Sequence, residues 1–257
     1  MKTSKSRTTA KRRVVGRAKA GGRELAETRG QIAAIQRVQA VIEFNLDGTI
    51  VTANDNFLGA VGYTLGEIQG QHHRMFVDPA YAQSVDYRLF WEKLARGEFD
   101  AGVYRRVGKG GREIWIQASY NPILDGQGTP CKVVKFATDI TAQRLAQANF
   151  EGQLSAIHKA QAVIEFNLDG SIITANDNFL GAVGYSLAEI QGQHHRLFVE
   201  PAMAQSAEYR LFWEKLARGE YDAGIYRRVG KGGREIWIQA SYNPILDMSG
   251  RPFKVVK

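Results

Sequence analysis

The sequence predicts an α+β fold that occurs twice, as two domains that each pair a five-stranded antiparallel sheet with helices on one face. Three observations predict it. The chain of 257 residues is long enough for two domains of ordinary size. Residues 34–135 align without gaps on residues 156–257, at an offset of 122, with 84 identities over 102 positions. Within each copy the elements follow the order β-β-α-α-α-β-β-β, which is typical of an antiparallel sheet with its helices gathered on one side.

The first copy opens with two strands and a helix. Residues 40–45 are predicted to form a strand, and the turn at residues 46–48 leads into a second strand at residues 49–52. Asn54 is a good N-cap for the helix that we expect over residues 56–61.

A longer helix and three strands complete the copy. After a short helix over residues 65–69, the longer helix runs over residues 84–96. Its apolar residues recur at the spacing that places side chains on one helical face: Tyr87, Phe90, Trp91 and Leu94. Three strands are predicted at residues 99–107, 113–120 and 132–138, and a tight glycine-rich turn joins the first two.

Helices are also predicted before the first copy and between the copies. We expect an N-terminal helix over residues 24–38 and a connecting helix over residues 142–160, which joins domain 1 (residues 39–141) to domain 2 (residues 161–257). Three apolar residues of the connecting helix step by four and three: Phe150, Leu154 and Ile157. Because this spacing suits packing against the same helix of a second chain, we expect a homodimer.

The positive net charge is concentrated at the N-terminus. The chain carries +8, yet its first 23 residues hold nine basic side chains and no acidic one, so the remainder carries −1. Residues 1–23 are therefore expected to be a disordered basic tail. Three interpretations stay open: a solvated tail with no specific nucleic-acid partner, weak adhesion to nucleic acid or anionic lipid, and an organellar transit peptide.

Other features indicate a cytoplasmic protein. No run of about 18 apolar residues could form a transmembrane segment, and the N-terminus lacks the apolar core of a secretory signal. Cys131 is the single cysteine, and Phe253 takes its place in the second copy. A thiol that phenylalanine can replace indicates a packing role in a reducing compartment.

The second copy stops at Lys257, the counterpart of Lys135, whereas the first copy continues through its last strand. We therefore expect domain 2 to be truncated at its last strand and a C-terminal output domain to be missing from this sequence.

The motifs of both copies resemble those of the PAS family, over about residues 34–141 and 156–257. In the first copy they are Leu46-Asp47-Gly48, Ala53-Asn54-Asp55-Asn56-Phe57, Val61-Gly62-Tyr63, Glu67-Ile68-Gln69-Gly70, Arg106-Val107-Gly108-Lys109-Gly110-Gly111-Arg112 and Asp139-Ile140-Thr141. The resemblance implies tandem PAS domains.

A narrower resemblance is to the PAS domains of soluble methyl-accepting chemotaxis receptors, of the aerotaxis and biofilm-dispersion types. It rests on residues 70–74, 90–91 and 115–122. It implies a sensory input module of a bacterial signal-transduction protein that responds to a small ligand, oxygen or redox state and engages the chemotaxis kinase complex. The alternatives are the input module of a histidine kinase or cyclic-dinucleotide enzyme, a cofactor-free dimerisation module, and an adaptor that uses the basic tail.

Resemblance also implies candidate ligand-binding residues, since some relatives hold FAD and others hold haem. The residues that match flavin-holding receptors are Asn54, Trp91 and Trp115, with Asn176, Trp213 and Trp237 in the second copy. Against flavin, residues 77–80 replace the basic and acidic cluster of those receptors. Trp115 also falls on the strand phase opposite Ile114 and Ile116, so packing against a partner is its alternative role.

A haem requires an imidazole that points into an apolar pocket. The candidates present in both copies are His73 and His195, or His72 and His194. Adjacent residues point apart, so at most one of each pair could be a ligand. The alternative is that these histidines cap or hydrogen-bond the loop before the long helix. Haem, FAD and no cofactor at all remain open, and no other metal site is expected.

Enzymatic activity is not expected. Neither Ser84 nor Ser119 lies in a nucleophile-elbow sequence, and residues 108–111 lack the ending of a phosphate-binding loop. Instead, we expect a signal relay through the end of domain 1 and the connecting helix, at Asp139, Ile140, Thr141 and Leu154.

Overall fold

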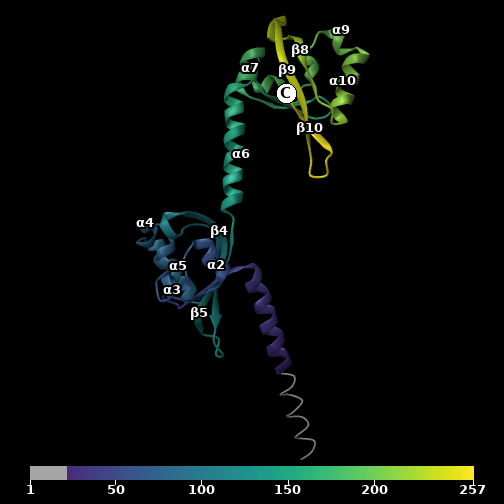
Figure 1. Ribbon diagram of the computed structural model, residues 1–257. Helices are drawn as coiled ribbons and strands as arrows, with labels where there is room; N and C mark the ends of the chain where they lie inside the picture. The colour runs from purple at the N-terminus through teal and green to yellow at the C-terminus, as the bar shows by residue number, and fades with distance from the viewer. Residues whose placement is uncertain (1–21) are drawn as a thin grey trace, which may run out of the picture. The chain divides into compact units, whose positions relative to one another are not determined.

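The computed structural model describes residues 22–257, which form two domains of the same architecture (Figure 1). The predicted basic tail lies outside the described residues, apart from its last two positions. A helix over residues 22–38 precedes domain 1, and the division into two compact units falls between Gln147 and Ala148.

Domain 1 contains an antiparallel sheet of five strands in the order β2-β1-β5-β4-β3. The strands are β1 (Ala40–Phe44), β2 (Ile50–Ala53), β3 (Asp100–Val107), β4 (Glu113–Leu124) and β5 (Pro130–Asp139). In the central strand β5, Lys135 lies opposite Ile42 of β1 on one side and Tyr120 of β4 on the other. The last strand of the chain order is thus the middle strand of the sheet.

Five helical segments lie between β2 and β3 in the chain. They are α2 (Asp55–Val61), α3 (Leu65–Ile68), the 3₁₀ turn η1 (His73–Phe76), α4 (Pro79–Ala82) and α5 (Val85–Ala95). The predicted caps are confirmed: Asn54 Oδ1 accepts from Phe57 N, and Ser84 Oγ accepts from Tyr87 N. The sequence did not predict η1 and α4. Pro79 is the first residue of α4, where its missing N–H costs no helical hydrogen bond.

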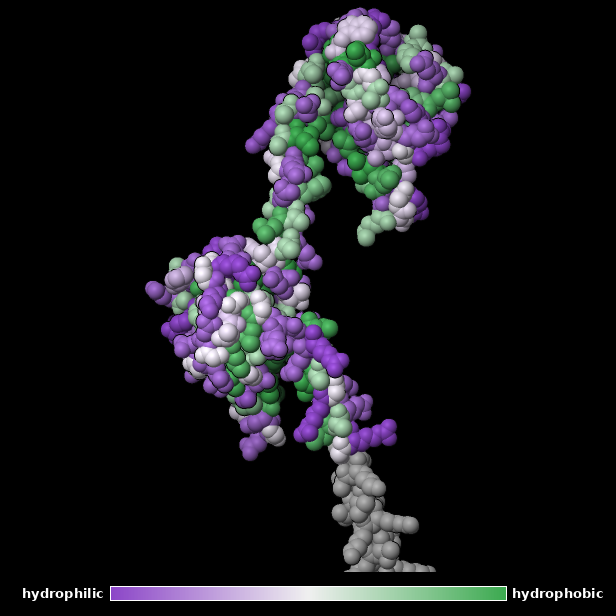
Figure 2. Space-filling view, in the orientation of Figure 1, coloured by the Kyte–Doolittle hydropathy of each residue, from purple (hydrophilic) through white to green (hydrophobic). Residues whose placement is uncertain are grey.

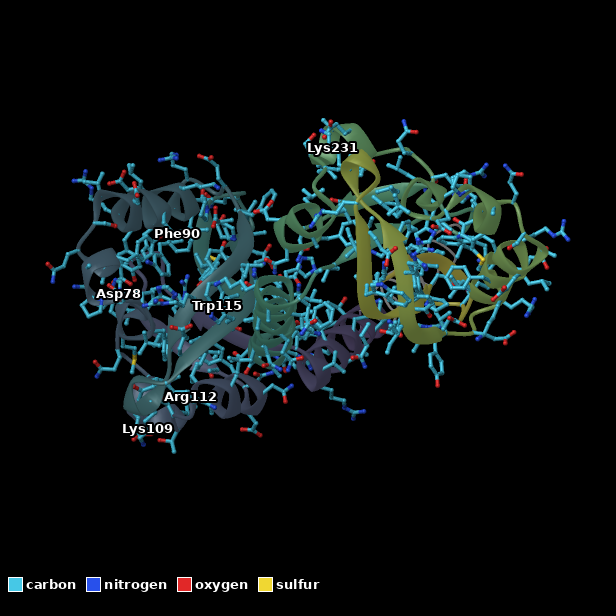
Figure 3. The ribbon with its side chains drawn as sticks, turned by 90° about the horizontal axis from the view of Figure 1, so that it is seen from above. Asp78, Phe90, Lys109, Arg112, Trp115 and Lys231 are labelled. Carbon is cyan, nitrogen blue, oxygen red and sulfur yellow. The ribbon has the colours of Figure 1, made fainter. Side chains whose placement is uncertain are left out.

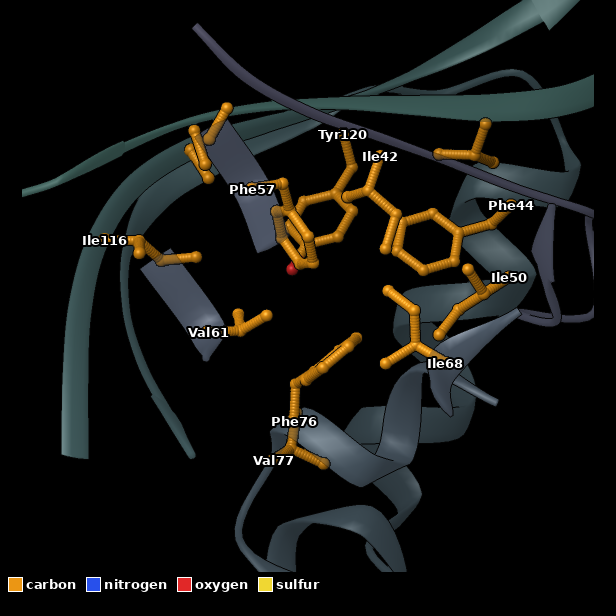
Figure 4. Packing of buried hydrophobic residues seen from close by; sticks show 14 of the residues in the cluster. Ile42, Phe44, Ile50, Phe57, Val61, Ile68, Phe76, Val77, Ile116 and Tyr120 are labelled. Carbon is orange, nitrogen blue, oxygen red and sulfur yellow. The ribbon is translucent and has the colours of Figure 1, made fainter. Parts of the chain in front are cut away.

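The core of domain 1 lies between the helices and one face of the sheet (Figure 4). In β4, Ile114, Ile116 and Ala118 are buried while Glu113 and Gln117 are exposed, which confirms the predicted alternation. The predicted helical stripe also packs on this core: Tyr87, Trp91 and Leu94 are buried, and Phe90 is partly buried against them.

The β3–β4 hairpin turn is short and tied to the helices. It forms η2 (Lys109–Gly111), in which Gly110 and Gly111 have φ of 71° and 80°. Lys109 Nζ donates to a carboxylate oxygen of Glu67, and Arg112 donates to the carbonyl of Ala60 at 2.5 Å; both basic residues lie together at this end of the domain (Figure 3). The glycine-rich segment is therefore a structural turn.

Domain 2 repeats this architecture, with strand order β7-β6-β10-β9-β8. Its strands are β6 (Ile164–Phe166), β7 (Ile172–Ala175), β8 (Asp222–Val229), β9 (Glu235–Leu246) and β10 (Pro252–Val256). Its helical segments are α7 (Asp177–Val183), α8 (Leu187–Ile190), η3 (His195–Phe198), α9 (Pro201–Ala204), α10 (Ala207–Ala217) and the hairpin turn η4 (Lys231–Gly233). The predicted α+β fold with two five-stranded antiparallel sheets is confirmed.

One continuous helix, α6 (Thr141–Ala160), begins directly after β5 and ends before β6.

The packing role predicted for Cys131 is wrong. Cys131 is exposed on β5, and its counterpart Phe253 is half exposed, so neither is a core packing residue. Both follow the turn that joins the last two strands of their sheet, where an apolar side chain can remain in solvent.

Candidate functional site

Asn54 links two elements of the backbone and has no hydrogen-bonding group left for a ligand. Its Nδ2 donates to the carbonyls of Gln36 (2.9 Å) and Gln39 (2.8 Å), and its Oδ1 accepts from the N–H groups of Val41 (2.9 Å) and Phe57 (3.0 Å). It thereby ties the end of the helix over residues 22–38 to β1 and α2. Asn176 makes the same four contacts in domain 2, with His158, Gln161, Val163 and Phe179.

His72 caps the loop before the long helix, as one of the two alternatives predicted. Its Nδ1 accepts from the N–H of Arg74 at 3.1 Å, and its ring packs against Trp91. The turn at Gly48 packs closely against the His72 ring. A Cβ at Gly48 would lie only 2.8 Å from His72 Nε2. His194 caps η3 in the same way.

His73 lies at the centre of a buried polar cluster and both of its ring nitrogens have partners. Nδ1 lies 2.9 Å from the Tyr87 hydroxyl, and Nε2 lies 3.0 Å from the Tyr120 hydroxyl. Figure 4 shows Tyr120 among the apolar core side chains. His195 of domain 2 has the corresponding tyrosine partners at 2.9 and 3.0 Å. Because haem ligation needs a free imidazole nitrogen, these histidines do not fit a haem.

Arg106 reaches the same cluster from β3. Its Nη2 donates to the Tyr120 hydroxyl at 3.0 Å, its Nη1 donates to the Arg105 carbonyl at 2.9 Å, and its guanidinium carbon lies 4.7 Å from the ring centre of Tyr104. The Nε–H of Arg106 is buried without a hydrogen-bond partner.

Lys135 reaches the cluster from the central strand β5. It is 1% exposed, and its Nζ lies 4.8 Å from the ring centre of Tyr120 and 5.5 Å from that of Phe57. Asp100 of β3 accepts from Lys93 Nζ at 2.7 Å and from the Tyr104 hydroxyl at 2.5 Å, so it is engaged elsewhere. Lys135 is thus a buried ammonium group surrounded by aromatic faces.

Burial controls the protonation of this cluster. Burial lowers the pKa of His73 well below its usual value, and the charges of Arg106 and Lys135 lower it further. The imidazole is therefore neutral at neutral pH. Since Tyr120 accepts from Arg106, its own proton is available to His73 Nε2, which places the imidazole proton on Nδ1, where it is donated to Tyr87. Burial also raises the pKa of Tyr120, so this hydroxyl keeps its proton.

The predicted tryptophans lie on different faces. Trp91 is buried on the inner side of α5, with its ring 5.5 Å from that of Phe44. The Trp115 side chain lies on the opposite face of the sheet from the core (Figure 3). Its indole N–H donates to Glu113 Oε1 at 2.8 Å, and its backbone N–H donates to Thr141 Oγ1 at 2.9 Å. The guanidinium carbon of Arg144 lies 5.2 Å from the Trp115 ring centre. Trp213 repeats the placement of Trp91, and Trp237 is 64% exposed.

The inner face of domain 1 contains a cavity of about 10 Å³, which Phe57, Phe76, Arg106 and Lys135 line with other residues. This volume accommodates about one water molecule, whereas pockets for drug-sized ligands have volumes of roughly 300–1,000 Å³. This cavity is too small for FAD or haem, whereas a more open groove of about 500 Å³ lies beside His72, Arg74 and Trp91. In domain 2 a cavity of about 440 Å³ opens beside Val256 and Lys257. The residues after Lys135 occupy the corresponding position in domain 1.

The histidines of the cluster were predicted from the sequence, but the side chains around them were not. Tyr120, Arg106 and Lys135 were not predicted as site residues. One available signal was the alternation of Val133, Lys135 and Ala137, which places the lysine on the buried face of the last strand.

Residues 22–257 lack two other features. None of their helices combines the length and apolarity that are needed to cross a bilayer. They also contain no group of three or more His, Cys, Asp or Glu side chains placed to hold a metal ion.

Comparison with known proteins agrees with this architecture. A family model described as PAS fold matches residues 50–137 and residues 172–257. The chain belongs to the PAS fold family. A solved PAS domain from Colwellia psychrerythraea is 22% identical, with a TM-score of 0.40, and the match covers 45% of this chain and 98% of that one.

Two curated relatives are a biofilm dispersion protein and an aerotaxis receptor. Biofilm dispersion protein BdlA of Pseudomonas aeruginosa is 47% identical over 226 residues, which is 88% of this chain and 54% of BdlA. The aerotaxis receptor of Escherichia coli is 35% identical over 80 residues, or 31% of this chain and 16% of that receptor. The chain therefore spans about half the length of BdlA. Its tandem PAS domains resemble the input modules of chemotaxis-type receptors.

Proposed function

We propose that this chain is the sensory input module of a cytoplasmic, homodimeric chemotaxis-type receptor, and that it has no enzymatic activity. A change at the His73 cluster of domain 1 would be passed through the sheet to α6 and onward to domain 2. The output domain and the chemotaxis kinase complex belong to this proposal as well, because the chain spans only about half of its relative BdlA.

The attachment of α6 at both ends carries the proposal. At its start, Thr141 Oγ1 accepts from Trp115 N at 2.9 Å, and Trp115 O accepts from Ile140 N at 2.8 Å. At its end, Asn176 Nδ2 donates to the carbonyl of His158 at 2.8 Å. A helix held by side chains of one domain at its first turn and of the next domain at its last turn can transmit a displacement between them.

The strands that contact the buried cluster are the strands that hold α6. Strand β4 carries Tyr120 on its inner face and Trp115 on its outer face. Strand β5 carries Lys135 on the inner face and ends at Asp139, whose Oδ1 accepts from Thr141 N at 2.8 Å. A shift of β4 against β5 would therefore alter the first turn of α6. This supports the predicted relay residues Asp139, Ile140 and Thr141.

The exposed apolar side chains of α6 support self-association. Phe150, Leu154 and Ile157 are 57%, 41% and 50% exposed, and apolar and polar side chains alternate along the visible surface of this helix (Figure 2). They recur at the a/d spacing of a helix pair, so a second copy of the chain is the partner that they fit.

Replacing Thr141 by valine tests the relay. Valine keeps the shape of threonine but cannot accept from Trp115 N, so we expect faster hydrogen exchange in the first turns of α6 and onward to residues 157–161. Thr138→Val is the matched control, because Thr138 is exposed on β5 and makes one long side-chain contact, to Gln39 at 3.4 Å. Equal exchange along α6 in the two variants would contradict the relay.

Replacing Leu154 by aspartate tests self-association. A charge on the exposed apolar stripe should lower the sedimentation coefficient at micromolar concentration, while Ser155→Asp adds the same charge on another face of α6 and should leave it unchanged. Identical sedimentation of both variants and the unaltered chain would contradict a dimer through α6.

A further inference from the structure

The inner face of domain 1 buries two cations that no anion balances. Arg106 is 6% exposed and Lys135 is 1% exposed. Among residues 22–257, no carboxylate lies within ion-pair distance of either; the nearby Asp100 is paired with Lys93. A charge buried without an opposite charge destabilises a fold. The sequence nevertheless places both cations on the core face of the sheet.

Unused donors of these two cations adjoin the same cavity. The Nε–H of Arg106 has no acceptor, and the Lys135 ammonium contacts only aromatic rings. Both side chains line the cavity of about 10 Å³ between α2 and the sheet. The other lining residues are apolar except Asp139, whose Oδ1 already accepts from Thr141 N at 2.8 Å.

The arrangement occurs again in domain 2. Arg228 Nη2 donates to the Tyr242 hydroxyl at 3.1 Å, and Arg228 Nε is likewise buried without a partner. Lys257 Nζ lies 5.0 Å from the Tyr242 ring centre and 5.4 Å from that of Phe179. The orphaned guanidinium donor therefore occurs in both copies.

We propose that domain 1 binds a small monovalent anion between Arg106 and Lys135, and that this anion is the ligand to which the module responds. The second half of the proposal rests on the proposed sensory function; the binding itself does not. The cavity accommodates about one water-sized group, so chloride is the anion nearest to its size, and nitrate or formate would require it to widen. A guanidinium group suits the planar anions in particular, because it donates in a fixed fork.

Anion binding is coupled to protonation of Lys135. Burial and the charge of Arg106 lower the pKa of Lys135 well below its usual value, and a bound anion would raise it again. Binding therefore takes up a proton, and affinity falls as pH rises above the lowered pKa of Lys135 in the unliganded domain. The other charged or titratable groups on the elements around Lys135 are His73, Tyr87, Lys93, Asp100, Tyr104, Arg106, Tyr120 and Asp139.

The test compares anions at constant ionic strength. The full chain is kept in sodium gluconate, whose anion is too large for the cavity, and chloride, nitrate or formate replaces it stepwise during calorimetric titration. Hydrogen exchange of β5 peptides that include residues 126–131, where the two copies differ in sequence, reports domain 1. We expect saturable heat and slower exchange in domain 1 with at least one of the three anions. Lys135→Met should weaken that response by about thirtyfold or more, the effect of truncating one side of a buried charge contact.

Lys132→Met is the matched control. It removes one positive charge from the same strand, but Lys132 lies on the outer face and contacts Glu43 at 3.5 Å. It should bind as the unaltered chain does. Absence of any saturable response in the unaltered chain, or equal binding by the Lys135 and Lys132 variants, overturns the anion site. Binding in domain 1 with no change in exchange along α6 overturns the response to the anion, whereas the Thr141→Val result tests the relay independently of any anion.

Discussion

The Tyr120 hydroxyl is the atom on which the buried cluster depends most. It bonds to His73 Nε2 at 3.0 Å and accepts from Arg106 Nη2 at 3.0 Å, and the side chain is fully buried. Tyr120→Phe removes this oxygen without changing the ring that packs against Phe44, Phe90 and Tyr104. The variant therefore isolates the polar contacts from the packing.

The expected loss of stability follows from the two bonds. A bond to a neutral partner contributes about 1 kcal/mol and one to a charged partner about 1.5–3 kcal/mol, and water cannot replace either at a buried site. Their sum predicts that domain 1 loses about 2 to 4 kcal/mol of unfolding free energy. With a urea dependence of about 1–3 kcal/mol per molar, the midpoint of domain 1 should fall by roughly 1 to 2 M.

The assay is urea unfolding followed by pulsed hydrogen exchange and mass spectrometry, read from peptides that include a position at which the two copies differ, such as residues 99–103 or 126–131. Tyr242→Phe makes the same deletion in domain 2 and should lower only that domain's transition. Tyr81→Met is the neutral control, since domain 2 itself carries Met203 at this position. A loss below about 0.5 kcal/mol in Tyr120→Phe would refute the contacts that we assign to the hydroxyl.

Three further predictions concern stability. In gluconate buffer at neutral pH, Lys135→Met should stabilise domain 1 by about 1–4 kcal/mol in urea unfolding, because it removes the cost of burying a basic group that no carboxylate pairs; a destabilised variant would contradict this. Stability should fall as pH drops below about 6.5, because the lowered pKa of His73 means that the unfolded chain binds more protons there; unfolding midpoints at pH 7.5 and 5.5 measure this, and equal midpoints would argue against a neutral buried imidazole. Gly48→Ala should cost about 1–3 kcal/mol, since Gly48 has φ of 87° and its Cβ would approach His72 Nε2 to 2.8 Å. Gly110 has φ of 71° and open space around it, so Gly110→Ala should lose less unfolding free energy than Gly48→Ala when both are measured by thermal melting.

The fold was predictable because each copy carries independent signals for the same elements. Alternation in residues 113–120 specified which face of β4 is buried, and the spacing of Tyr87, Trp91 and Leu94 specified the face of α5. The gapless duplication then fixed the domain count. The short segments η1 and α4 escaped prediction, because four residues are too few to show a helical period.

The candidate site was predictable only in part. A histidine pair in a loop was visible in the sequence, but the assignment of partners depends on long-range packing: Tyr120 is 47 residues from His73 along the chain. A single sequence contains no signal that these side chains meet. Trp115 illustrates the opposite case, because strand phase alone indicated that it lies opposite the core.

Resemblance to flavin- and haem-holding receptors suggested candidate residues without testing the space available to a cofactor. Asn54 is the residue type found in such receptors, yet its side-chain amide forms all of its hydrogen bonds with backbone groups. His73 matches as an imidazole, yet two tyrosines occupy both nitrogens. Volume and hydrogen-bond saturation are properties of the packed core, so they could not be predicted from the motifs.

The most direct test of a sensory module is whether a change confined to the buried cluster reaches the far end of α6. Hydrogen exchange at residues 157–161, next to the Asn176 contact with His158, should be faster in Tyr120→Phe than in Tyr81→Met under conditions where both remain folded. If the two variants exchange equally there, while domain 1 alone is altered, then α6 carries no signal between the domains and the proposed function is wrong.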